Sequence, residues 1–211
     1  MPSPIASVPF YDKHARQLAE LYDRLAFEQL HQQWIKQAPV GGKALDVGCG
    51  SGRDACWLAL NGWQVTAVEP ASAMREVAVH KASNLGIDSN SIHWLDDSLP
   101  QLSSLEGQQF DLILVSAVWM HLSVAHRPLA LRRLQGLMSA KGVLVLTLRN
   151  GPNDDERPMY PVSSAEIRSI ARPMGLMVEE IGEREDRLDL LKRPDVRWQT
   201  LLIRKKPLRP V

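Results

Sequence analysis

Apolar residues near the start of the chain follow the spacing of a helix rather than that of a strand. Within residues 11–37 they stand at Leu18, Leu21, Tyr22, Leu25, Leu30 and Trp34. Pro39 follows this stretch, and proline cannot continue a helix. The pattern therefore predicts a helix or a helix pair over residues 11–37, ahead of the first strand.

Short, continuous apolar runs alternate with helical patterns over the next hundred or so residues. The expected strands are residues 44–47, 64–68, 91–95, 110–116 and 142–148, and the expected helices are 52–61, 71–85 and 123–138. Strands without polar alternation are typical of a parallel sheet that is covered on both faces. Because parallel neighbours need crossover connections, the alternation predicts a doubly wound α/β sheet.

The rhythm changes after Asn150. Residues 151–157 are polar and predict an exposed loop, and the capping box from Ser163 to Glu166 predicts a short helix ending near residues 173–175. Residues 176–181 and 196–203 then predict two strands, joined by a charged link at 183–195 that is short enough for an antiparallel pair. The pattern alone also allows a plain hairpin outside the main sheet.

Composition and charge narrow the function classes. The chain has 211 residues, 45% of them hydrophobic and 23% charged, which suits one globular α/β domain. It contains no apolar run of membrane-spanning length and no secretion signal at its start, so we expect a cytoplasmic protein without a membrane partner. A net charge of +1 argues against nucleic acid as a partner. The basic cluster of Arg204, Lys205, Lys206 and Arg209 is interpreted as a solvated tail.

The two cysteines, Cys49 and Cys56, are too few for a metal framework. We interpret both as small packing residues and expect no metal site.

The run LDVGCGSG at residues 45–52 carries the most functional information. It predicts a buried strand that contains Asp46 and then a turn with glycines at 48, 50 and 52 that opens a helix. α/β proteins bind nucleotide-like ligands at such a turn. The spacing is G-x-G-x-G, whereas dinucleotide sites use G-x-G-x-x-G, and Arg53 occupies the position of that last glycine. Asp46 suits a ligand that carries a positive end.

With Asp46 before the glycines, the run resembles the first motif of the class I S-adenosylmethionine-dependent methyltransferases, (hydrophobic)-D-(hydrophobic)-G-x-G-x-G. The resemblance implies a single, mostly parallel seven-stranded sheet with a C-terminal antiparallel strand pair. It implies a helical lid at residues 1–40 and a methyltransferase domain at 41–211. The implied cofactor is S-adenosylmethionine, with S-adenosylhomocysteine as product, bound by Asp46 and by the turn residues Gly48, Cys49, Gly50 and Gly52.

Acids at the ends of the next two strands complete the implied cofactor site. Glu69, followed by Pro70, stands 23 positions after Asp46 and would accept hydrogen bonds from the ribose hydroxyls. The same acid occurs in NAD sites, so Glu69 alone does not separate the two cofactors. Asp96 or Asp97 matches the third motif, whose acid accepts from the adenine amino group. Asp97 is the preferred candidate, and ordinary turn chemistry competes with this role.

Further candidates come from the helices that flank the turn. Arg53 could bind the methionine carboxylate of the cofactor, or could instead pair with Asp54 or a surface acid. Small members of the family often place an N-terminal helix over the cofactor with an aromatic hydroxyl reaching in, which makes Tyr11 and Tyr22 candidates. His14 falls near the same helix face, although any amphipathic helix would show this spacing.

The segment after the fourth expected strand matches the fourth motif, whose residues face the methyl donor. It contains Ser116, Trp119 and His121 and lacks the N-P-P-Y type sequence of methyltransferases acting on nucleic acid bases. We therefore expect a small-molecule acceptor. His121 is the candidate general base, with turn packing as the alternative. Trp119 could wall the acceptor site or belong to the core.

Three other functions remain open at this stage. These are methylation of RNA, nicotinamide-dependent oxidoreduction and cofactor binding without catalysis. The methylated atom, the identity of the acceptor and the oligomeric state do not follow from the residues.

Overall fold

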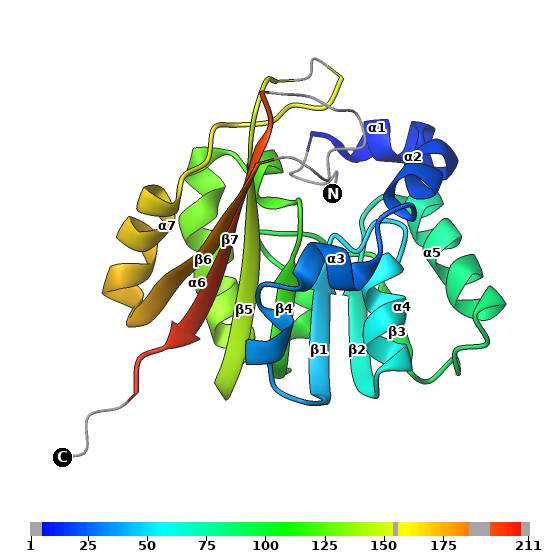
Figure 1. Ribbon diagram of the computed structural model, residues 1–211, viewed down its shortest axis with the longest axis horizontal. Coiled ribbons are helices and arrows are strands. Elements are labelled where there is room, and N and C mark those ends of the chain that lie inside the picture. Colours follow the sequence, from blue (N-terminus) through cyan, green and yellow to red (C-terminus); the bar gives the residue numbers. More distant parts are fainter. Residues whose placement is uncertain (1–5, 154–155, 186–194, 208–211) are drawn as a thin grey trace.

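The computed structural model describes residues 6–153, 156–185 and 195–207, and its core is one mixed sheet (Figure 1). Within the described residues the sheet has seven strands in the order β3-β2-β1-β4-β5-β7-β6. Their bounds are β1 Gly42–Val47, β2 Trp63–Val68, β3 Ile92–Leu95, β4 Phe110–Val115, β5 Met138–Asn150, β6 Leu176–Glu185 and β7 Arg197–Lys205. The doubly wound, seven-stranded α/β prediction is confirmed.

The C-terminal strands decide between the two arrangements that the sequence allowed. β7 runs antiparallel to β5 along residues 143–150 and antiparallel to β6 on its other side. It is therefore inserted into the main sheet, as the resemblance implied, rather than forming a separate hairpin. Most of the charged link, residues 186–194, and Arg209 lie outside the described residues.

Helices cover both faces of the sheet. The α-helices are α1 Val8–Lys13, α2 Ala15–Tyr22, α3 Phe27–His31, α4 Arg53–Leu60, α5 Ser72–Asn84, α6 Arg127–Leu137 and α7 Ser164–Ala171. The 3-10 turns are η1 Ile35–Gln37, η2 Ser103–Leu105, η3 Trp119–His121, η4 Val124–His126 and η5 Arg172–Met174. In Figure 1, α3 and α4 lie in front of β1 and β2, whereas α6 lies behind the sheet.

The apolar runs of the strands are explained by this double cover. Leu112 and Leu114 of β4 belong to the core on the α4 face, whereas Ile113 and Val115 belong to the core on the α6 face. Successive side chains of a strand point to opposite faces, so both sets must be apolar when both faces are buried.

The N-terminal segment is divided into more pieces than predicted, namely three short α-helices and a 3-10 turn. The small side chains of Ala15 and Ala19 let α2 pack closely on Met74 of α5. The α3 helix packs on α4, where the Phe27 and Trp57 rings stack with centroids 3.9 Å apart. The segment therefore has two docking sites on the domain, and a single straight helix could not reach both.

Helix ends follow the sequence signals. The Ser163 hydroxyl accepts from the Glu166 amide at 3.1 Å at the start of α7, as the capping box predicted.

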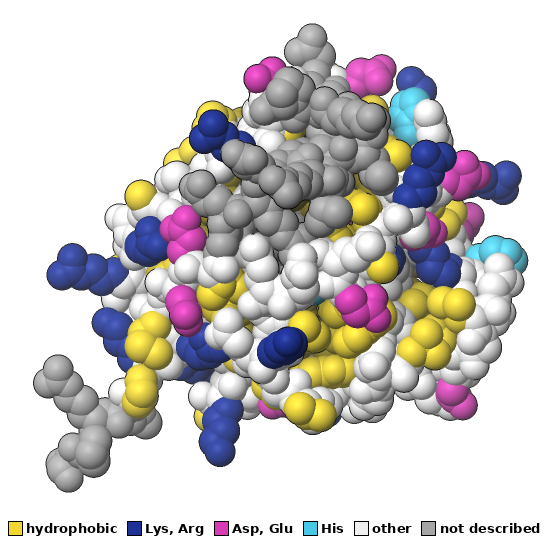
Figure 2. Space-filling view, viewed as in Figure 1, with side chains coloured by type: hydrophobic (Ala, Val, Ile, Leu, Met, Phe, Trp, Pro, Cys, Tyr) yellow, Lys and Arg dark blue, Asp and Glu magenta, His cyan; other side chains and the backbone are white. Residues whose placement is uncertain are grey.

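None of the helices in the described part of the chain is long and apolar enough to cross a membrane. On the face drawn in Figure 2, Lys and Arg side chains are scattered among acidic ones.

Candidate functional site

A cavity of about 890 Å³ opens at the carboxyl ends of the parallel strands, beneath α1 and α2. Most of the residues singled out from the sequence line it: Tyr11, Tyr22, Asp46, Gly48, Cys49, Gly50, Arg53, Glu69, Pro70, Ser116 and His121. His14 lines it as well. The fold thus gathers, in one place, residues from the N-terminal segment and from the ends of β1, β2 and β4.

The glycine turn brings the chain back over β2. The amides of Gly48 and Cys49 both donate to the carbonyl of Val68, at 2.7 and 3.0 Å. Apart from Gly50 itself and its chain neighbours, no atom of the described residues lies within 4 Å of the position that a Cβ would take at Gly50. Burial, followed by the charge of Asp46, raises the pKa of the Cys49 thiol, so this group stays protonated. The turn therefore offers backbone surface rather than a reactive side chain.

Asp46 is a buried acid that lacks a full set of partners. It is 2% exposed, and its Oδ2 atom has no hydrogen-bond partner in the described part of the chain. Burial, and then the nearby charge of Asp54, raises its pKa. A buried carboxylate oxygen without a donor is costly, because its water is lost and nothing replaces it. Asp46 is thus prepared to accept from a ligand that brings a proton donor or a positive charge.

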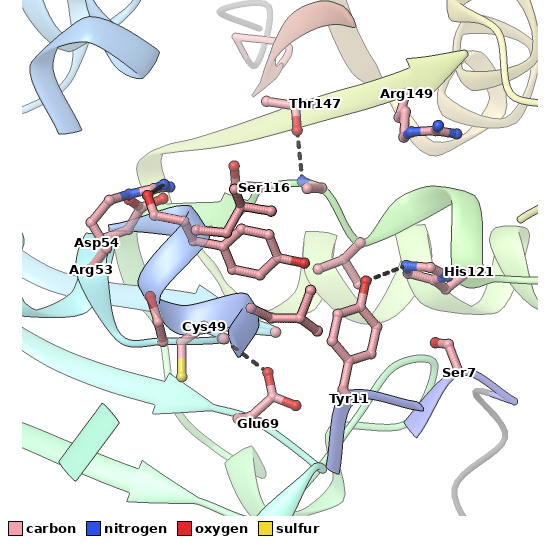
Figure 3. Close-up of a pocket in the computed structure, with 18 of the residues that line it drawn as sticks. Ser7, Tyr11, Cys49, Arg53, Asp54, Glu69, Ser116, His121, Thr147 and Arg149 are labelled. Atoms are coloured by element: carbon pink, nitrogen blue, oxygen red, sulfur yellow. Dashed lines mark hydrogen bonds and ion pairs between the residues drawn. The ribbon is translucent and has the colours of Figure 1, made fainter. Parts of the chain in front are cut away.

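Glu69 is held by the backbone at the end of β2. Its Oε2 accepts from the Gly50 amide at 2.9 Å and its Oε1 from the Ala71 amide at 3.0 Å. Burial raises its pKa to about 7, although both hydrogen bonds act in the opposite direction. Figure 3 shows the Glu69 side chain beside the glycine turn and facing the cavity. The carboxylate is fixed in place while its other lone pairs stay able to accept from a ligand.

Arg53 pairs with Asp54, which was the alternative to a role in binding the cofactor. Its Nε donates to Asp54 Oδ1 at 2.6 Å, and its Nη1 donates to the Tyr22 carbonyl at 3.2 Å. The side chain still lines the cavity and is 21% exposed. It therefore links α4 to the end of α2 while leaving part of its guanidinium at the cavity surface.

Three predicted cofactor residues do not line the cavity. A Cβ on Gly52 would stand 2.8 Å from that of Ala78, so this glycine lets the turn pack closely on α5. The Asp97 carboxylate accepts from the amides of Ser98 and Ser104, at 2.7 and 2.8 Å. Asp96 forms an exposed ion pair with Arg75 at 3.3 Å. Turn chemistry thus occupies Asp97, and an adenine contact by either acid stays a prediction.

His121 lies at the opposite side of the cavity, in η3, and is 6% exposed. Its Nδ1 lies 3.0 Å from the Pro158 carbonyl, and its Nε2 lies 3.0 Å from the Tyr11 hydroxyl. A carbonyl oxygen can only accept, so Nδ1 carries the proton. In the neutral imidazole Nε2 then accepts from the Tyr11 hydroxyl, and Figure 3 shows this contact as a dashed line. The geometry orients Nε2 as a proton acceptor on the cavity side.

The two tyrosines close the cavity from the N-terminal segment. Burial raises the pKa of the Tyr11 hydroxyl, and likewise that of Tyr22, so both act as neutral hydroxyls. The Arg157 guanidinium lies 5.1 Å from the Phe10 ring centre and 5.9 Å from that of Tyr11. Trp119, by contrast, is fully buried in the core on the α6 face and does not line the cavity.

Several lining residues were not predicted. They are His31 and Asp54 near Arg53, Thr147 and Arg149 on β5, and Thr200 on β7. Thr147 Oγ1 accepts from the Ala117 amide at 2.8 Å, which supports the left-handed backbone (φ +58°) at that residue. Thr147 and Arg149 could have been found in the sequence, because they are polar residues at the end of the apolar run of β5.

Across the described ranges, no group of three or more His, Cys, Asp or Glu side chains is placed to hold a metal ion.

Sequence comparison identifies relatives of part of the chain. Residues 45–146 match a protein family described as a methyltransferase domain. YqeM of Bacillus subtilis, whose name marks it as a candidate methyltransferase, is 30% identical over 101 residues. This match covers 46% of the chain and 39% of YqeM, so the chain spans well under half of that relative's length.

Solved structures share the fold across nearly the whole chain. A TehB-like S-adenosylmethionine-dependent methyltransferase from Corynebacterium glutamicum is 20% identical, with a TM-score of 0.66 over 94% of this chain and 100% of the other. The 1,6-didemethyltoxoflavin-N1-methyltransferase of Burkholderia thailandensis, solved with its acceptor and S-adenosylhomocysteine, is 15% identical, with a TM-score of 0.70 over 96% and 88% of the two chains. At these identities the likeness establishes the fold.

Proposed function

We propose that the chain is a class I S-adenosylmethionine-dependent methyltransferase and that it transfers a methyl group from S-adenosylmethionine to a small-molecule acceptor. The observation that carries this proposal is Asp46. A buried carboxylate oxygen without a partner, at the glycine turn of the cavity, needs a ligand that donates to it.

The residues present fit the cofactor. Asp46 Oδ2 matches the α-amino group, and Glu69 is oriented by two amides so that it can accept from the ribose hydroxyls. Gly50, whose amide donates to Glu69, leaves open space at the turn. The Burkholderia relative in fold was solved with S-adenosylhomocysteine bound, which supports the same ligand class here.

S-adenosylmethionine supplies a methyl group that its sulfonium has already activated, so the protein chiefly aligns the acceptor and removes a proton where one must leave. His121 is our candidate acceptor of that proton, since it lines the cavity and its Nε2 contacts the Tyr11 hydroxyl there. Tyr11, whose hydroxyl contacts His121, would shield this end of the cavity from water. Thr147 and Thr200 offer hydroxyls that could orient a polar acceptor.

A small acceptor is favoured over RNA. The net charge is +1, and basic side chains on the face shown in Figure 2 are scattered rather than gathered. The cavity lies beneath α1 and α2, which suits a ligand small enough to fit inside it entirely rather than an RNA chain. The substrate of the Burkholderia relative, 1,6-didemethyltoxoflavin, is such a molecule.

Calorimetric titration tests the cofactor assignment. S-adenosylmethionine and S-adenosylhomocysteine should bind the wild type, and Asp46→Ala and Glu69→Ala should each weaken binding at least tenfold, which is about 1.4 kcal/mol. Glu76→Ala, an exposed acid on α5 outside the cavity, is the matched control. Equal affinity in wild type and both variants would contradict the assignment, as would tight NAD binding without S-adenosylmethionine binding.

Label transfer tests the acceptor class. Wild type is incubated with methyl-labelled S-adenosylmethionine and either a panel of small hydroxyl, amine and thiol compounds or total tRNA. Transfer to a small compound supports the proposal. Transfer to tRNA alone, or binding without transfer to anything offered, contradicts it.

A further inference from the structure

A chain of buried polar side chains runs from the N-terminal segment to the cavity. Trp34 Nε1 donates to His31 Nδ1 at 3.0 Å, and His31 Nε2 lies 2.9 Å from Asp54 Oδ2. Asp54 Oδ1 then accepts from Arg53 Nε at 2.6 Å. Trp34 and His31 are each 1% exposed and Asp54 is 5% exposed. Four side chains from two segments thus form one connected network in the interior.

The direction of each hydrogen bond follows from its partners. An indole nitrogen can only donate, so His31 Nδ1 carries no proton and must accept. His31 is therefore neutral, with its proton on Nε2, and it donates to Asp54. Burial alone would raise the pKa of Asp54, but His31 and then the Arg53 guanidinium outweigh it and hold that pKa below its usual value. Asp54 is thus an ionised acid with one oxygen committed to each neighbour.

The network fixes the position of Arg53. With Nε held by Asp54 and Nη1 held by the Tyr22 carbonyl, the guanidinium plane has little freedom. Its Nη2 has no hydrogen-bond partner within the residues that the structure describes, and the side chain lines the cavity. Asp46 is close enough to interact electrostatically with Arg53. One end of the cavity therefore holds a fixed cation beside a carboxylate oxygen without a partner.

This pair of charges matches the amino-acid end of the proposed cofactor, which carries an ammonium group and a carboxylate on one carbon. We propose that His31 is a positioning residue that, through Asp54, orients Arg53 to bind the α-carboxylate of that ligand. This inference rests on the proposed function. It makes the N-terminal segment part of the cofactor site, in addition to a cover over it.

The alternative role for His31 is structural, because α3 packs on α4 at this point. That contact is made chiefly by the stacked rings of Phe27 and Trp57. Phe27→Leu therefore weakens the same packing without removing any hydrogen bond of the network, and it serves as the matched control. A network that merely stabilises the fold would behave like Phe27.

The test measures affinities for three ligands that differ only at the relevant end. S-adenosylhomocysteine carries both amine and carboxylate, its decarboxylated analogue keeps the amine, and 5′-methylthioadenosine has neither. Each is titrated into wild type, Arg53→Met, His31→Phe, His31→Gln and Phe27→Leu, with melting temperatures recorded in parallel. The decisive quantity is the affinity for S-adenosylhomocysteine relative to that for methylthioadenosine, which a general loss of stability leaves unchanged.

Arg53→Met should lower that ratio by about thirtyfold and His31→Phe by about tenfold, as expected for loss and for misalignment of a charge-assisted bond. His31→Gln can still donate to Asp54 and accept from Trp34, and should restore the ratio to within about threefold. Affinities for the other two ligands should change by less than about twofold.

The positioning role is wrong if wild type binds S-adenosylhomocysteine but His31→Phe weakens all three ligands equally, or if Phe27→Leu lowers the ratio as much. A wild type that binds none of the three would overturn the proposed function itself. The two failures are therefore distinguishable.

Discussion

The two sides of the cavity are built in different ways. The acidic side, defined as Asp46, Asp54 and Glu69, lies at the ends of β1 and β2 and in the first turn of α4. The opposite side, which we call the β4–β5 side, is defined as Ser116, His121, Thr147 and Arg149. Figure 3 shows Asp54 and Glu69 apart from His121, Thr147 and Arg149 across the cavity. One side offers buried carboxylates, and the other offers a histidine, hydroxyls and a guanidinium.

The difference separates two tasks. Carboxylates that are fixed by backbone amides suit recognition of a ligand with hydroxyl and ammonium donors. On the β4–β5 side, the Tyr11 hydroxyl at Nε2 and the Pro158 carbonyl at Nδ1 hold the His121 ring in place at the cavity. The acidic side should therefore govern affinity for the cofactor, and the β4–β5 side should govern turnover.

Substitution of His121 is the strongest way to separate the sides. His121→Asn keeps a donor near the Pro158 carbonyl and removes the Nε2 lone pair. If His121 is the general base, kcat should fall by about 10²–10⁴. The affinity for S-adenosylhomocysteine should stay within about twofold. Steady-state kinetics with an acceptor from the label-transfer screen, together with calorimetry, measure both. An unchanged kcat would assign His121 to packing of the turn.

Substitution of Asp46 should have the opposite profile. Asp46→Asn removes the negative charge that we propose binds the amino group of the cofactor. Affinity for S-adenosylhomocysteine should therefore fall by about a hundredfold. The melting temperature of the unliganded protein should not fall, because the wild-type Oδ2 is already without a partner.

Thr147→Val is the comparison variant from the other side. It strands the Ala117 amide that now donates to Thr147 Oγ1, so it should lower the melting temperature while leaving cofactor affinity within about twofold. If Asp46→Asn lowered stability but preserved affinity, the assignment of the acidic side to binding would be wrong.

The two sides also differ in how far the sequence revealed them. Asp46 and Glu69 could be located because parallel strands end at one edge of the sheet, and Asp46 stands one residue before the end of β1 while Glu69 directly follows β2. The role of Asp97 could not be decided, because its partner Ser104 lies in the short 3-10 turn η2, which no sequence periodicity predicted. Thr200 reaches the cavity only because β7 is inserted next to β5.

His31 illustrates the limit for the N-terminal segment. Helical spacing indicated that residues 11–37 pack on something, but it does not specify the surface. The partner of His31 is Asp54, 23 positions later, and their contact depends on how α3 docks on α4. Tyr11 and Tyr22 were candidates through the family resemblance, and both do line the cavity.

Gly48, which follows β1, and Val118, which follows β4, are in close contact where the two sides of the cavity meet. A Cβ on Gly48 would stand 2.5 Å from Cγ2 of Val118, and Gly48 has a φ of +67°, which disfavours any side chain. Gly48→Ala should lower the free energy of unfolding by about 2 kcal/mol through strain and overpacking. Adding Val118→Ala should recover the steric part, as measured by denaturant titration. No recovery would mean that backbone strain alone explains the loss.

The smallest predicted effect is the pH response of Glu69, whose pKa is raised by burial to about 7 from a usual value of 4.5. Between those values the folded protein holds a proton that the unfolded chain has released. The stabilisation from this group is therefore fully present below pH 4.5 and is lost as the pH rises through about 7. Ribose hydroxyls that donate to Glu69 favour its ionised form, so ligand affinity should change in the opposite direction. Affinity for S-adenosylhomocysteine should rise about tenfold from pH 6 to pH 8, with proton release on binding near neutrality.

Calorimetry in buffers of different ionisation enthalpy measures that proton release, and melting temperatures at both pH values measure the stability change. Glu69→Gln cannot titrate and should flatten both responses, whereas Thr147→Val should retain them because it alters only the β4–β5 side. A pH response that survives in Glu69→Gln would move the titrating group elsewhere, with Asp46 as the next candidate because burial raises its pKa as well. If Glu69 or Asp46 is the titrating group, it lies on the acidic side, and the pH dependence of binding then separates the two sides without knowledge of the acceptor.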